Sequence, residues 1–102
     1  MISDYTFGNS QAAVNLMKTL RTDSYSCYTR DVLRPLSKFS HCSSAIMQIP
    51  DASLCEAVLL VWRRLFEDYI KAKDIPEKLK TLACCVITTR FRIMRKQLTK
   101  RR

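Results

Sequence analysis

Glycine is nearly absent from this chain, and its scarcity constrains the fold more than any other feature of the sequence. The 102 residues include one glycine and three prolines, so few positions favour the tight turns that join short strands. No stretch alternates apolar and polar residues for long, and there is no internal repeat or flexible linker. We therefore predict an all-α fold, a small four-helix domain formed by residues 1–102.

Capping residues and prolines predict where the helices begin and end. Asn9 or Ser10 is placed to cap the first helix. The second helix is expected to begin at Pro35, because proline fits the first turn of a helix, and to stop at Pro50. The four expected helices span residues 10–21, 35–48, 54–73 and 76–98, and a basic tail follows over 99–102.

The third expected helix has apolar residues around most of its circumference. Its start is marked by a capping box, in which Ser53 accepts from the third backbone N–H and Glu56 reaches back to the cap. A helix that is apolar on most sides needs other helices on most sides. Two shorter helices and one face of the last helix are too little cover, so we expect this helix to lie at the centre of the fold or at an interface.

An interface on the third helix would involve Leu59, Trp62 and Phe66. We expect a symmetric homodimer here, because a chain of this length buries a small core and gains stability from a partner. A host protein that docks around Trp62 is an alternative occupant, and a monomeric core with Trp62 inside is another. If a host protein docks here, the chain is a helical interaction module, and its basic tail serves as a nuclear-targeting signal.

The last helix is predicted to be amphipathic and basic. At about 100° per residue, one face collects six apolar residues: Leu79, Ala83, Ile87, Phe91, Met94 and Leu98. The other face collects basic residues and threonines. Asp74 is placed to cap this helix, and Pro76 suits its first turn.

The positive charge of the chain is concentrated in that last helix. The formal net charge is +9 at pH 7, and residues 51–102 contain thirteen bases and six acids. The last 25 residues hold nine bases and no acid. Such an uneven distribution draws in polyanions.

We therefore expect the chain to be a non-enzymatic nucleic-acid-binding protein that prefers RNA to DNA. Arginine and lysine displace counterions from phosphates, and threonine hydroxyls bond phosphate or sugar oxygens. The turn before the last helix lacks the glycine of a helix-turn-helix, which favours sequence-independent recognition of double-stranded RNA. The candidate binding residues are Lys78, Arg92, Arg95, Lys96, Lys100, Arg101 and Arg102. A solvated basic face and binding to anionic lipid are the alternatives.

The sequence favours an intracellular protein, in the cytoplasm or the nucleus. Its first residues lack the basic and apolar regions of a secretory signal, and five cysteines cannot all pair within one chain. Even the longest apolar stretches, such as Ala57 to Trp62, are far shorter than a membrane span. Serine, leucine and arginine, which have six codons each, are frequent, as in a reading frame overprinted on another gene. That balance suggests a viral accessory protein, such as a suppressor that sequesters RNA from host defence.

Catalytic and metal-binding patterns are weak. Cys27, His41, Cys42 and Cys55 lack the paired spacing of zinc ligands. His41 and Cys42 are neighbours on a helix and point about 100° apart, so they cannot act as base and nucleophile. We expect no enzymatic activity, no metal and no cofactor. Cys85, among basic residues, is the one thiol whose reactivity the pattern favours.

Overall fold

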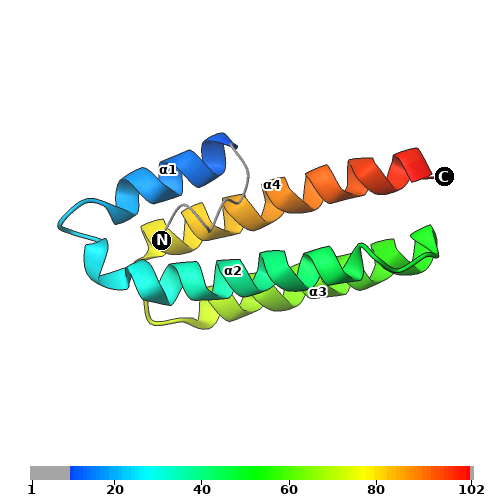
Figure 1. Ribbon diagram of the computed structural model, residues 1–102. Helices are drawn as coiled ribbons and strands as arrows, with labels where there is room; N and C mark the ends of the chain where they lie inside the picture. Colours follow the sequence, from blue (N-terminus) through cyan, green and yellow to red (C-terminus); the bar gives the residue numbers. More distant parts are fainter. Residues whose placement is uncertain (1–9, 102) are drawn as a thin grey trace.

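Four α-helices make up most of residues 10–101, the part of the chain that the computed structural model describes (Figure 1). No strand occurs among these residues, so the predicted all-α fold is confirmed. None of the described helices combines the length and the hydrophobicity needed to cross a bilayer. The helices are α1 (Gln11–Leu20), α2 (Thr29–Ile46), α3 (Ala52–Ala72) and α4 (Glu77–Arg101), with a short 3-10 helix, Ser26–Tyr28, before α2.

The start of α1 follows the expected pattern, whereas the start of α3 does not. Ser10 caps α1, because its side chain accepts from the backbone N–H of Ala13 at 3.2 Å. For α3 the cap is Asp51, whose Oδ1 accepts from the N–H of Leu54 at 3.0 Å. The expected Ser53 cap was therefore wrong. The carboxylate of Asp51, two residues earlier, caps the N–H groups of an earlier first turn, so the helix is longer by two residues at its start.

Helix α2 begins at Thr29, six residues before the expected start at Pro35. Pro35 lies inside the helix and is buried, although it removes one backbone hydrogen bond there. The extra turns bury Val32 and Leu33 in the core, and this burial offsets the lost bond. Propensity alone placed the boundary at the proline, while packing moved it toward the N-terminus.

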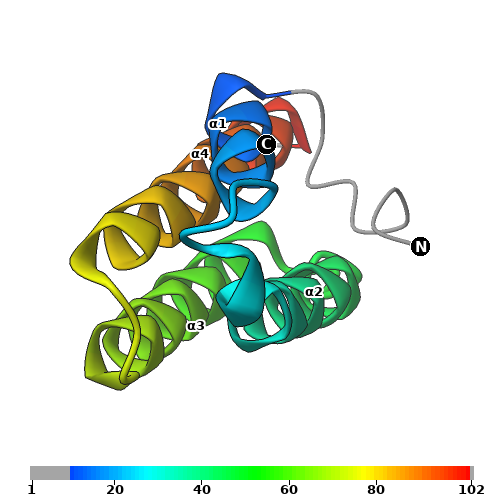
Figure 2. The ribbon, with the colours of Figure 1, turned by 90° about the vertical axis from the view of Figure 1, so that its left-hand side faces the viewer.

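The helices form two layers, and α4, which belongs to the first, also packs against both helices of the second. Helix α1 lies along the first half of α4, and α2 and α3 lie side by side beneath them (Figures 1 and 2). We call these pairs the α1/α4 layer and the α2/α3 layer. Helix α4 contacts each of the other three helices. The described residues measure 46 × 26 × 19 Å along their principal axes.

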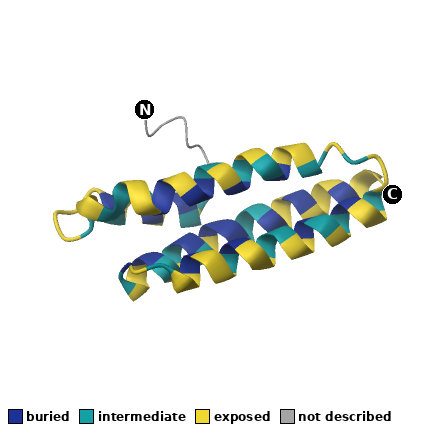
Figure 3. Cartoon of the chain, turned by 90° about the horizontal axis from the view of Figure 1, so that it is seen from below, coloured by how far each residue is buried: buried dark blue, intermediate teal, exposed yellow. Residues whose placement is uncertain are grey.

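The core lies between the two layers. All six apolar residues expected on the inner face of the last helix are buried. Helix α3 faces this core with Cys55, Leu59, Phe66 and Ile70. Seen from below, buried and exposed residues alternate along each helix (Figure 3). Much of the exposed apolar surface is on α3, at Leu54, Leu60, Val61, Leu65 and Tyr69.

Candidate nucleic-acid interface

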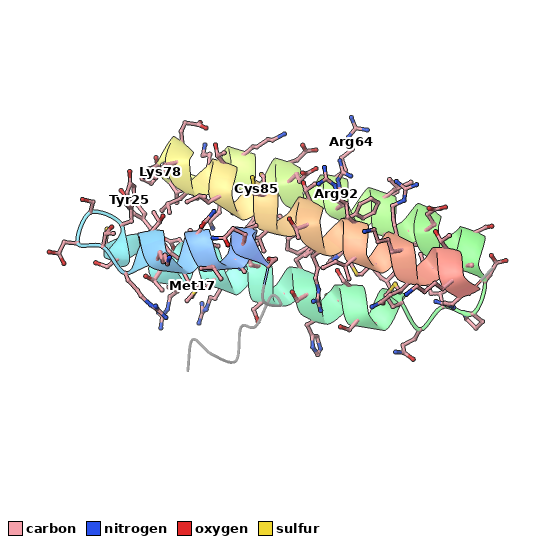
Figure 4. The ribbon with its side chains drawn as sticks, turned by 90° about the horizontal axis from the view of Figure 1, so that it is seen from above. Met17, Tyr25, Arg64, Lys78, Cys85 and Arg92 are labelled. Carbon is pink, nitrogen blue, oxygen red and sulfur yellow. The ribbon has the colours of Figure 1, made fainter. Side chains whose placement is uncertain are left out.

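A row of exposed cations follows the outer face of α4. Arg92, Lys96 and Lys100 are exposed and stand four residues apart, so they share one side of the helix over about 12 Å. None of the three forms an ion pair with another described residue. Figure 4 shows Lys78, Cys85 and Arg92 along α4, from its first turn to its middle. This row is the part of the predicted site that remains free to bind an anion.

Lys78 extends the row toward α1. Its side chain is exposed, and its Nζ lies 5.8 Å from the ring centroid of Tyr25, in the connection that follows α1. At this distance the ring attracts the ammonium group while solvent still reaches it. From Lys78 to Lys100 the cationic face is about 33 Å long.

Arg95 interacts with other residues of the chain and is not free to bind an anion. Its Nε donates to Oε2 of Glu56 on α3 at 3.2 Å, and its guanidinium carbon lies 5.8 Å from the ring centroid of Phe91. The side chain is therefore directed across the helix toward α3. Arg95 is exposed, but its charge is already paired.

Arg101 is engaged more completely. Its guanidinium donates to the carbonyl oxygens of Met47, Ile49 and Pro50, at 3.1, 2.8 and 3.3 Å. These carbonyls belong to the connection between α2 and α3, so Arg101 fastens the end of α4 to that connection. The last residue of the expected basic tail, Arg102, lies outside the described residues.

Two cations that the sequence interpretation missed belong to the same layer. Lys18 is in the last turn of α1, and Arg21 is its C-cap. Both are exposed. Residues 10–22 contain no acidic residue, and Glu77 is the one acid within α1 or α4. The lack of acids in the first helix was the signal that could have found them.

The three residues expected at an interface differ in how far they are buried. Leu59 and Phe66 are buried in the core of this chain, with exposures of 1% and 8%. Trp62 is half-buried, its ring 4.6 Å from that of Phe66 and its Nε1 3.4 Å from the carbonyl oxygen of Phe39. Any partner near Trp62 would therefore meet its exposed neighbours, Leu65 and Tyr69.

The cysteines and the histidine do not gather into a site. Within residues 10–101, no group of three or more His, Cys, Asp or Glu side chains is placed to hold a metal ion. Cys84 and Cys85 line a groove of about 430 Å³ on the side of α4 that adjoins α3. Burial raises the pKa of the Cys84 thiol above its ordinary value, and the Glu67 carboxylate raises it further. Cys84 is thus held as a neutral thiol.

No protein-family model, curated protein or solved structure matches this chain.

Proposed function

We propose that this protein binds nucleic acid, RNA in preference to DNA, through the α1/α4 layer and without catalysing a reaction. The observation that carries the proposal is the charge of that layer. It presents six exposed cations that form no ion pair with described residues: Lys18, Arg21, Lys78, Arg92, Lys96 and Lys100. The one acid, Glu77, is at the start of α4 and lies 3.8 Å from Lys80.

Unpaired cations on a rigid helix suit a polyanion. Each cation that replaces a condensed counterion on a phosphate adds to affinity, and the gain is entropic and salt-dependent. A cation already paired, as Arg95 is with Glu56, contributes less, because binding must break the existing pair. The free cations of α1 and α4 therefore form the proposed binding surface, and Arg95 and Arg101 hold α4 in place.

The chemistry of the face favours RNA and sequence-independent contacts. Between its cations, α4 presents Thr81 and Thr89, whose hydroxyls bond phosphate and sugar oxygens. Phosphate and sugar oxygens are the same at every nucleotide, so contacts to them do not depend on the base sequence. The minor groove of double-stranded RNA is wide and shallow and displays 2′-hydroxyls, so a nearly straight helix can lie against it.

Salt dependence tests the proposal. We expect binding to a duplex RNA of about 20 base pairs to show a slope of log affinity against log salt near −5, for six phosphates engaged. Between about 50 and 200 mM salt, affinity then falls about 10³-fold. The triple variant R92Q/K96Q/K100Q removes three cations, so its slope is less steep by nearly three units. Over the same range of salt concentration, the affinity of this variant falls only about 40-fold.

A matched variant on the other layer is the control. R30Q/R34Q/K38Q removes the same charge from α2, and we expect it to leave the slope near −5. If both triple variants changed the slope equally, binding would depend on the net charge of the protein and not on the α4 face. An unchanged slope in the α4 variant would exclude the proposed face. Repeating the titration with duplex DNA and single-stranded RNA tests the preference, which tighter binding to DNA would contradict.

A further inference from the structure

A groove of about 570 Å³ runs between α2 and α3. Its floor includes Leu65, which follows Arg63 by two residues and so lies on nearly the opposite side of α3. Arg63 faces α4, because its guanidinium carbon lies 4.8 Å from the ring centroid of Phe91. The groove therefore opens away from α4, on a different side of the molecule from the proposed nucleic-acid surface.

The floor of the groove is apolar and aromatic. Trp62, Leu65, Phe66 and Tyr69 line it, at the spacing i, i+3, i+4 and i+7 that makes one stripe of a helix. The Phe66 ring contacts Trp62 at 4.6 Å and Tyr69 at 6.4 Å between centroids. Leu65 is 56% exposed and Tyr69 is 52% exposed. Covering a preformed apolar floor of this kind with another apolar surface lowers the free energy of the complex.

The rim of the groove is basic. Arg30, Arg34 and Lys38 stand four residues apart along α2 and line one edge, over about 12 Å. Lys73 lines the end of the groove, where its Nζ lies 4.9 Å from the Tyr69 ring centroid. Asp31 is the one acid in the lining. The three cations of α2 form no ion pair with another described residue.

We propose that this groove binds an acidic amphipathic helix of a protein partner. Apolar side chains of that helix cover Leu65 and Tyr69, and a row of carboxylates at four-residue spacing meets the cations of α2. Two to three turns of the partner match the length of the cationic edge. This site and its occupant are independent of the proposed nucleic-acid binding.

The charge of the rim disfavours the simplest alternative, a second copy of this chain. In a symmetric dimer the same surface meets itself, so the cations of one α2 would approach the cations around its partner's groove. Like charges in such a contact are costly. An acidic helix removes that repulsion and supplies the missing counter-charges.

A designed peptide tests the groove. The probe is a helical peptide of about 15 residues, with leucines at i, i+3, i+4 and i+7 and glutamates in the adjoining rows. Trp62 is the single tryptophan of the chain and lines the groove, so its emission reports occupancy. We expect saturable binding, and no matching binding by a peptide of the same composition with the order scrambled.

Matched variants locate the binding. R30Q/R34Q/K38Q is expected to weaken the peptide affinity about tenfold, and R92Q/K96Q/K100Q to leave it unchanged. Leu65→Ser is expected to weaken it about tenfold. Leu60→Ser, at a leucine of similar exposure that lies outside the groove, is expected to have no effect.

Three outcomes would overturn the inference. The first is the absence of peptide binding, or equal binding of the designed and scrambled peptides. The second is an affinity that the groove variants leave unchanged. The third is a dimer in solution that Leu65→Ser dissociates, which would make a second copy the occupant.

Discussion

Lys100 and Arg101 are adjacent basic residues with different roles. Lys100 is exposed and unpaired among the described residues, whereas Arg101 donates to three carbonyl oxygens of the α2–α3 connection. A planar guanidinium reaches several acceptors at once, and an ammonium group on a flexible chain does not hold that geometry. Of two neighbouring residues with the same charge, Lys100 thus remains available for the proposed binding, whereas Arg101 contributes to stability.

We expect Arg101→Ala to lower the free energy of unfolding by about 1 kcal/mol, because three hydrogen bonds to a charged donor are lost at an exposed position. Arg101→Lys is expected to recover little of this. Lys100→Ala serves as the control, with unchanged stability and a salt slope for RNA less steep by about 0.9. Urea unfolding and the RNA titration measure the two effects. Equal stability of the two alanine variants would contradict the role given to Arg101.

The sequence predicted the positive charge of the candidate site, but it could not predict which of the basic residues are paired and which are free. Nine bases without an acid were visible as a run. Which of them are paired depends on contacts far apart in the chain: Arg95 with Glu56, and Arg101 with the connection that precedes α3. Periodicity within one helix contains no information on such partners. The groove was hidden for the same reason, since its floor and its cationic edge come from different helices.

At the scale of the helix, apolar periodicity was reliable and helix starts were not. Six of the seven buried residues of α4 were predicted, because they share one period, and the prediction missed only Val86. The starts of α2 and α3 were placed too late. In each case the sequence offered a strong local signal, Pro35 or the Ser53 capping box, and packing or an earlier cap decided otherwise.

The cap of α3 gives a direct test. Asp51→Ala removes the side-chain acceptor for the N–H of Leu54, and we expect it to lower the free energy of unfolding by about 1 kcal/mol. Ser53→Ala is expected to change it by a few tenths at most, since Ser53 is exposed and follows the cap. Thermal or urea unfolding of the two variants decides between the caps. A larger loss for Ser53→Ala would restore the capping box.

At the scale of the molecule, the two proposed surfaces lie on different layers. The described residues are 26 and 19 Å across their shorter axes, while a charge is screened within about 8 Å at physiological salt. We therefore expect RNA and the acidic peptide to bind together, each changing the other's affinity by less than about twofold. Titrating peptide into the RNA complex, with Trp62 emission as the signal, measures this coupling. Displacement of one ligand by the other would place both on a single surface.

The contact of α4 with every other helix has a consequence for synthesis. A ribosome delivers α1, α2 and α3 before the helix that touches all of them. Until residues 77–101 have left the exit tunnel, the apolar faces of the earlier helices lack their cover. The nascent chain is therefore most exposed to aggregation just before α4 emerges, and chaperones that act at the tunnel mouth have the most to protect at that stage.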